Sequence, residues 1–167
     1  MRIKNKRYIL RPPKAGDLGW IVYRHGILYS QEFGWNERFE GLVAKIVGEF
    51  VEKFDPAYER CWVAELDKGE RAGSVFVVKD QEGVAKLRLL LVEPKARGLG
   101  IGADLVEQCV QFSQNAGYKK LILWTNDVLV SARRIYEASG FVLVKEEPHQ
   151  RFGVPLVGQV WEMKLVE

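Results

Sequence analysis

The sequence predicts a mixed α+β fold with one sheet of about seven strands flanked by helices. Two observations predict it. Apolar residues recur at every second position in some segments and at three- and four-residue steps in others, so strands and helices share the chain. The length suits one buried core, and residues 1–167 show no linker or repeat that would divide them. We therefore expect a single domain with the element order β-α-α-β-β-β-α-β-α-β-β.

The first elements are a short strand and two helices. Residues 7–11 form a strand candidate that two prolines end. A helix follows because apolar residues then recur at helical spacing, and Asp17 is its expected N-cap. Asn36 comes after a Gly–Trp break and is the expected N-cap of a second helix, which runs to about Phe50.

Three strands joined by short turns come next. Residues 61–66, 72–79 and 84–92 show strand patterns, and the turns between them contain Gly69 and Gly83. The last of these segments is almost continuous in apolar residues. That pattern is typical of a central strand that is covered on both faces.

Two helices and three strands complete the order. We expect a helix from the glycines near residue 100 to about Ala116, with Gly117 just beyond its end. The remaining segments alternate between strand and helix patterns. They are a strand at 120–125, a helix at 129–139 and strands at 141–145 and 157–165.

Composition argues against several classes of protein. The net charge of +3, from 25 basic and 22 acidic residues, gives no reason to expect a nucleic-acid partner. No apolar run reaches the ~18 residues of a membrane span, and the start of the chain lacks the features of a signal peptide. His25 and His149 lack metal-ligand spacing, and His25 is expected in the core with its polar atoms bonded. Cys61 and Cys109 read as structural thiols, so we expect a cytoplasmic protein without metal or membrane contact.

The sharpest local signal is the glycine-rich loop from Arg97 to Gly102. Glycines let a backbone approach a ligand closely, and the first amides of a helix point outward without partners. The helix dipole adds positive charge there, so the loop suits phosphate oxygens, and Lys95 and Arg97 add further charge. A tight turn without any ligand is the alternative.

A dinucleotide-binding fingerprint is the rival interpretation of this loop. Gly98, Gly100 and Ala103 satisfy its G-x-G-x-x-G/A form, and Asp127 resembles its ribose-binding acid. That fold places the fingerprint after its first strand, whereas several strands precede it here. A nucleotide-dependent oxidoreductase is therefore the weaker alternative.

The chain resembles the GCN5-related N-acetyltransferase (GNAT) family. The family's Gln/Arg-x-x-Gly-x-Gly/Ala motif is matched by Arg97, Gly100 and Gly102, and its Tyr-x-x-x-Gly-Phe helix end is matched at 136–141. The family's order of elements also agrees with the one above and implies a mostly antiparallel sheet. Residues 124–127 and 156–161 resemble acetyltransferase domains fused behind MarR-type winged helices in bacterial regulators.

The resemblance implies acetyl-CoA as cosubstrate and a site spread over the loop and the strand before it. In the family the CoA pyrophosphate lies on the loop amides, and the pantetheine arm lies between the fourth and fifth strands. The residues at these positions are Leu91, Val92, Arg97, Gly98, Leu99, Gly100, Ile101 and Gly102. The Val92 amide would face the thioester oxygen and stabilise the oxyanion that forms there.

Two further cofactor contacts follow from the resemblance. Many members carry an asparagine seven residues before the tyrosine, where this chain has Leu129. Asn126 is expected to take over its contact with pantetheine, although an exposed loop also explains it. Arg133 and Arg134 lie near the expected position of the 3′-phosphate, and a solvated helix face is their alternative.

The resemblance also assigns a chemical role to Tyr136, which occupies the family's position near the CoA sulfur. A phenol of pKa near ~10 can protonate a leaving thiolate, so Tyr136 is the expected general acid after direct attack by an amine. A tyrosine packed between helix and sheet is the alternative. An attacking amine must first lose a proton, and the candidate bases are Glu32, Glu93 and Asp127, of which Glu93 and Asp127 have structural alternatives as turn and helix-cap residues.

The acceptor is expected to be a primary amine of a small molecule or peptide whose identity the sequence does not reveal. Aromatic residues between Trp20 and Trp35 lie in the family's acceptor-binding region, although core packing explains most of them. Arg88 either pairs with an acid such as Glu65 or holds an acceptor carboxylate. A non-catalytic acyl-CoA sensor and a homodimer remain further possibilities.

Overall fold

The computed structural model describes residues 7–166, in which seven strands form one sheet in the order β1-β2-β3-β4-β5-β7-β6. The expectation that the chain start is not a signal peptide concerns residues 1–6, which lie outside the described residues. The strands are β1 (Tyr8–Arg11), β2 (Arg60–Leu66), β3 (Arg71–Gln81), β4 (Val84–Val92), β5 (Lys120–Asn126), β6 (Val142–His149) and β7 (Leu156–Lys164). Every neighbouring pair is antiparallel except β4 with β5, so the predicted mixed, mostly antiparallel sheet is confirmed.

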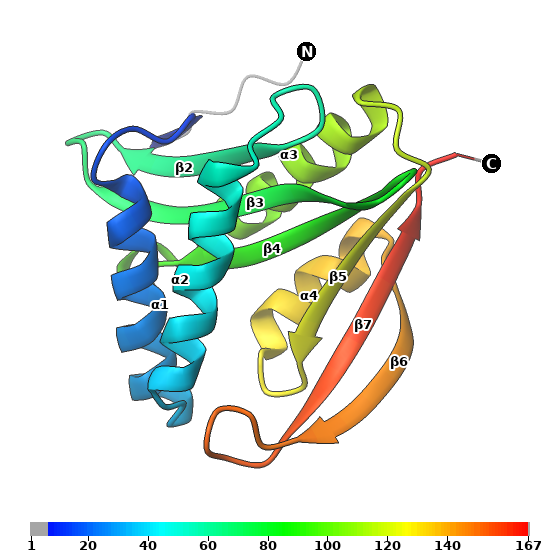
Figure 1. Ribbon diagram of the computed structural model, residues 1–167. Helices are drawn as coiled ribbons and strands as arrows, with labels where there is room; N and C mark the ends of the chain where they lie inside the picture. Colours follow the sequence, from blue (N-terminus) through cyan, green and yellow to red (C-terminus); the bar gives the residue numbers. More distant parts are fainter. Residues whose placement is uncertain (1–6, 167) are drawn as a thin grey trace.

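The described residues form four α-helices, which cover the two faces of the sheet, α1 and α2 in front of it and α3 and α4 behind it (Figure 1). Their bounds are α1 (Asp17–Phe33), α2 (Glu37–Glu52), α3 (Ile101–Asn115) and α4 (Val130–Ser139), and a 3₁₀ turn, η1 (Pro94–Ala96), precedes α3. Each face has its own apolar core. Ile21, Phe39 and Phe76 belong to the front core, whereas Leu105 and Tyr136 belong to the rear core.

The sheet opens between β4 and β5. Their parallel pairing runs only from Val84–Lys120 to Leu87–Leu123, although both strands continue beyond it. Two residues past the last pair, Leu89 has a φ of 56°, and it is the one non-glycine residue with positive φ in the described part of the chain. The register with β3 shifts between Ser74 and Phe76 at the same level. This bulge bends β4 and leaves its last residues unpaired on the side of β5.

The predicted elements are all present, and the structure corrects details at their ends. Asn36 caps α2, because its side chain accepts a hydrogen bond from the Arg38 amide. The expected cap at Asp17 is wrong: Gly16, in a left-handed conformation, is the N-cap of α1. β6 continues to His149 instead of ending near residue 145.

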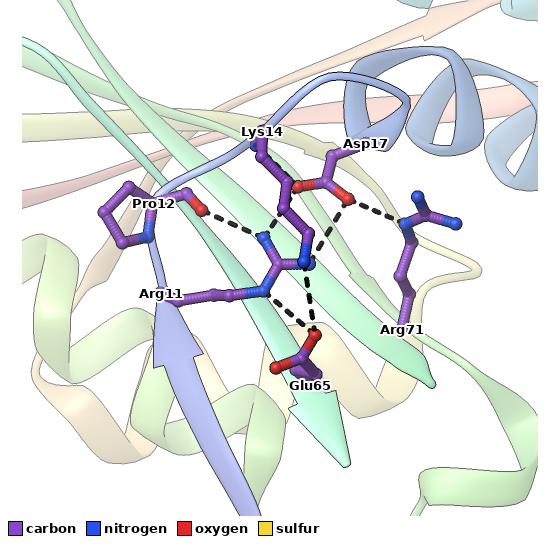
Figure 2. Close-up of polar contacts among 6 residues, drawn as sticks. All are labelled: Arg11, Pro12, Lys14, Asp17, Glu65 and Arg71. Atoms are coloured by element: carbon purple, nitrogen blue, oxygen red, sulfur yellow. Dashed lines mark hydrogen bonds and ion pairs between the residues drawn. The ribbon is translucent and has the colours of Figure 1, made fainter. Parts of the chain in front are cut away.

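Asp17 instead centres a network of charges that joins the start of α1 to three strands (Figure 2). Its carboxylate accepts hydrogen bonds from Arg11 on β1 and Arg71 on β3, both at 2.7 Å, and from the Lys14 amide at 2.7 Å. Arg11 Nε also lies 3.3 Å from a Glu65 carboxylate oxygen on β2. Asp17 is fully buried, so the two arginines supply the partners that a buried charge requires.

The two cysteines expected to be structural, and the histidine expected in the core, are all buried. Cys61 and Cys109 are buried free thiols, and His25 is buried against Tyr29 and Phe39. The expectation for the polar atoms of His25 is only half right: Nδ1 lies 2.7 Å from the Ile21 carbonyl, while Nε2 has no hydrogen-bond partner among the described residues. None of the described helices is both long and apolar enough to cross a membrane.

Candidate active site

A cavity of about 610 Å³ lies where β4 and β5 part. Its walls come from the end of β4, the loop before α3, the first turn of α4 and the last turns of α1. The lining residues are Leu28, Tyr29, Glu32, Phe33, Leu90, Leu91, Val92, Ala96, Arg97, Gly98, Gly100, Ile101, Gly102, Ala103, Val128, Leu129, Val130, Ser131, Ala132 and Ile135. Most of the predicted cofactor residues are therefore brought to one cavity.

The three glycines of the loop have different structural roles. Gly98 and Gly100 have φ values of 84° and 86°, a conformation that other residues adopt only with strain. Gly102 is helical, and a Cβ on it would lie 2.8 Å from Ile135 Cδ1, so this glycine lets α3 and α4 approach each other. The first helical bond of α3 runs from Asp104 N to Gly100 O, which leaves the preceding amides outside the helix ladder.

The two cations expected to attract phosphate, Arg97 in the loop and Lys95 in η1 before it, are both paired with carboxylates. Arg97 donates to Glu32 of α1 at 2.5 Å, and both residues line the cavity. Lys95 pairs with Glu70, away from the cavity lining. Two residues selected from the sequence for different roles, Arg97 for the cofactor and Glu32 for the base, are thus in direct contact.

The end of β4 presents backbone groups to the cavity. The Glu93 amide bonds the Ala72 carbonyl on β3 at 2.8 Å. Successive amides of an extended strand point to opposite sides, so the Val92 amide points away from β3 toward the opening. On that same side Tyr29 donates its hydroxyl hydrogen to the Leu90 carbonyl at 3.2 Å.

Five of the residues expected to contact the cofactor do not line the cavity: Leu99, Asn126, Arg133, Arg134 and Tyr136. Leu99 is exposed, and Asn126 is buried with its side-chain oxygen 2.7 Å from His149 Nε2. Arg133 donates to the Asp127 carbonyl at 2.9 Å. Tyr136 is buried in the rear core, against which the lining residues Ala132 and Ile135 pack, and burial raises the pKa of its hydroxyl.

The other candidate bases have structural partners. Glu93 forms a bidentate ion pair with Arg24 of α1. Arg24 Nε lies 3.0 Å from Glu93 Oε2, and Arg24 Nη2 lies 2.9 Å from Glu93 Oε1. Asp127 accepts a hydrogen bond from the Val157 amide at 2.9 Å. Its expected role as the cap of the next helix is wrong, because Leu129 is the N-cap of α4 and no side chain caps that helix. Of the three carboxylates, Glu32 alone lines the cavity.

The expected Arg88–Glu65 pair is also wrong. Glu65 is held by Arg11 and Lys14 at the other end of the sheet. The carboxylates that act electrostatically on Arg88 are those of Glu49 and Asp80. Arg88 is not a lining residue of the cavity, so the structure gives it no contact with an acceptor there.

Sequence reasoning missed the α1 contacts that shape this site. Arg24, Tyr29 and Glu32 each hold a different part of the β4 end and its loop. Arg24, Leu28 and Glu32 are spaced at four-residue steps, which places them on one helix face. The four-residue spacing can be recognised in the sequence. It does not indicate which distant strand this helix face contacts. Val128, just before α4, and Ser131, in its first turn, also line the cavity and were missed for the same reason.

Comparison with known proteins identifies the family. The model of the acetyltransferase (GNAT) family matches residues 26–141, which include the loop and all of α4. The chain belongs to this family. It is therefore an acyltransferase of the GNAT type. An uncharacterized N-acetyltransferase of Schizosaccharomyces pombe, C1271.07c, is 32% identical over 130 residues, which cover 77% of this chain and 78% of the relative.

Solved structures share the fold. YncA of Salmonella typhimurium, solved with its cofactor acetyl-CoA, has a TM-score of 0.73 and 17% identity over 97% of this chain and 96% of its own. The spermidine N-acetyltransferase of Vibrio cholerae, solved with CoA and spermine, has a TM-score of 0.71 and 16% identity over 95% of this chain and 96% of its own. At these identities the likeness concerns the fold.

Proposed function

We propose that this protein transfers the acetyl group of acetyl-CoA to a primary amine of a small molecule or peptide. The observation that carries the proposal is the cavity at the β4–β5 opening, which joins a helix N-terminus to an unpaired strand edge. Family membership supports the reaction class. The cavity supports the roles of individual residues.

The residues of the cavity fit acetyl-CoA. The amides before Asp104, outside the α3 ladder, and the positive end of the α3 dipole suit the two phosphates. Gly98 and Gly100 hold the loop in a conformation that keeps these amides accessible. The free edge of β4 suits the amide groups of a pantetheine arm, which can pair with it as a strand would. Acetyl-CoA supplies an activated thioester at the inner end of this path.

The chain supplies a hydrogen-bond donor at each end of the reacting group. The Val92 amide, which points into the opening, would hold the thioester oxygen as negative charge develops on it. Tyr136 is the proposed donor to the departing sulfur; because it does not line the cavity, this role requires its hydroxyl to reach the sulfur when acetyl-CoA is bound. Its raised pKa keeps the hydroxyl protonated and suits hydrogen-bond donation to the sulfur, but it makes full transfer of the proton to a thiolate less favourable.

Glu32 is the proposed proton acceptor for the incoming amine. It is the one carboxylate among the described lining residues, and the rings of Tyr29 and Phe33 lie beside it on the wall. Aromatic faces attract ammonium groups, and an apolar wall accepts a hydrocarbon stem. This lining favours an acceptor that joins a primary amine to an apolar group.

Thermal denaturation with different cofactors tests the proposal. We expect acetyl-CoA to raise the Tm, since a ligand of the native state stabilises it, and NAD(P) to leave it unchanged. The opposite pattern would support an oxidoreductase and overturn the assignment. Release of free thiol from acetyl-CoA with a panel of amines then separates an enzyme from a sensor, because a sensor binds acetyl-CoA without turnover.

The variant Tyr136→Phe tests the acid. Loss of the hydroxyl should lower kcat about 10²-fold or more and change acetyl-CoA affinity little, because general acids contribute about that much to the chemical step. Single-turnover rates and CoA affinity measured side by side check this. Unchanged single-turnover rates would assign Tyr136 to packing against Phe141 alone.

A further inference from the structure

We propose that Glu32 occupies, on Arg97, the place that the cofactor diphosphate takes when acetyl-CoA binds. The ion pair is then a displaceable latch: cofactor binding draws Arg97 away and leaves the Glu32 carboxylate facing the acceptor. The inference rests on the proposed function, since it requires a CoA-type ligand.

The geometry places both partners of the latch at the cavity. Arg97 Nη2 lies 2.5 Å from Glu32 Oε1, and both residues line the cavity. The Arg97 amide is bonded to the Pro94 carbonyl at 3.3 Å, which fixes its backbone at the end of η1. Its side chain, 56% exposed, is free to change partners, and exposed ion pairs of this kind are weak.

Glu32 depends on Arg97 for its counter-ion within the described structure. It is the penultimate residue of α1, where the negative end of the helix dipole disfavours a carboxylate. The last turn of α1, which is described in full, contains no basic residue. Arg97, from a loop distant in sequence, is the cation that neutralises this carboxylate.

A diphosphate on the α3 amides would compete for the same guanidinium. Arg97 lies three residues before the N-cap Gly100, so an anion seated at the helix start lies within its reach. Arginine forms charge-assisted, often bidentate hydrogen bonds with phosphate groups as it does with carboxylates, so the doubly charged diphosphate can compete with the single carboxylate of Glu32. One guanidinium cannot hold both anions in full, so binding of the diphosphate to Arg97 would weaken the pair that Arg97 forms with Glu32.

The exchange has a consequence for the acceptor. Once Arg97 has turned to the phosphates, Glu32 is a carboxylate without a counter-ion beside the rings of Tyr29 and Phe33. A protonated amine would replace the lost guanidinium there and then release its proton to Glu32. The latch thus favours binding of acetyl-CoA before the amine.

The isosteric variant Glu32→Gln tests the latch by calorimetry with two probes, CoA and pantetheine, which lacks the diphosphate. We expect CoA to bind about two- to fivefold more tightly to the variant than to the wild type, the range expected for loss of an exposed ion pair. Pantetheine affinity should not change. Equal effects on both probes, or no effect on CoA, would overturn the proposal.

Two further variants isolate the role of Arg97. In an Arg97→Gln background, Glu32→Gln should no longer tighten CoA, whereas simple repulsion between Glu32 and the diphosphate would keep the effect and refute the latch. Glu70→Gln, which removes the partner of Lys95 outside the cavity lining, should leave CoA affinity within twofold. If CoA fails to bind the wild type, the proposed function fails; if it binds and Glu32→Gln changes nothing, only the latch fails.

Discussion

At the scale of single residues, His25 sets a limit on stability in mild acid. Its ring is 1% exposed, and burial lowers its pKa to about 4, against the opposing effect of its bond to the Ile21 carbonyl. An unfolded histidine has a pKa of about 6.5, so the unfolded chain takes up a proton that the folded chain refuses. Stability should therefore be full above about pH 6.5 and fall by roughly 3 kcal/mol between there and pH 4.

His25→Phe removes this titration and keeps a ring against Tyr29 and Phe39. Urea unfolding at a series of pH values should show a flatter profile for the variant between pH 6.5 and 4. Parallel profiles for the two proteins would place the acid sensitivity elsewhere. The sequence placed His25 in the core through its apolar helix face, but only the packed structure shows that Nε2 of its ring has no hydrogen-bond partner among residues 7–166.

At the scale of elements, the contact between β3 and β4 depends on Gly73. A Cβ built there lies 2.6 Å from the Leu91 carbonyl oxygen, a backbone atom that cannot turn aside. Gly73→Ala should cost about 1–3 kcal/mol, the usual cost of overpacking, and should weaken acetyl-CoA binding because Leu91 and Val92 must shift. Urea unfolding and calorimetry with acetyl-CoA check both effects.

Gly48→Ala is the matched control. Gly48 lies inside α2, and a Cβ there meets nothing within 4 Å. Alanine should stabilise this helix position by about 1 kcal/mol and leave cofactor binding unchanged. If the two variants behaved alike, the close approach of β3 to β4 would not explain Gly73.

At the scale of the whole molecule, the Asp17 network connects elements that are far apart in the sequence (Figure 2). Burial would raise the pKa of Asp17, but hydrogen bonds from Arg11, Arg71 and the Lys14 amide outweigh it and lower that pKa. A lowered carboxylate pKa stabilises the fold above the unfolded value of about 3.9, and this stability is lost only as pH falls through the lower folded value. The network should therefore persist in the pH range where His25 already destabilises the fold.

Asp17→Asn should cost about 3 kcal/mol at neutral pH, because two partly buried arginines lose their charged partner. Glu82→Gln, at the exposed Lys79 pair, should cost close to nothing. Urea unfolding of both variants measures the contrast. A cost for Asp17→Asn as small as that of the surface variant would show that the network contributes no net stability.

The sequence by itself determined the order of the elements, their approximate bounds and the glycine loop. These features depend on local properties: the period of apolar residues, the capping chemistry of Asn36 and the backbone freedom of Gly98 and Gly100. The family motifs were readable for the same reason, since each occupies one short segment.

Only the tertiary structure decided which charges meet and which side chains reach the cavity. Asp17, expected to cap a helix, binds arginines from two strands, and Glu32, selected as a base, is held by Arg97. Leu89 has a positive φ that no local preference of leucine predicts, and the opening beside it forms the cavity. Ion pairs and strand bulges depend on residues far apart in the chain, so a local pattern cannot specify their partners.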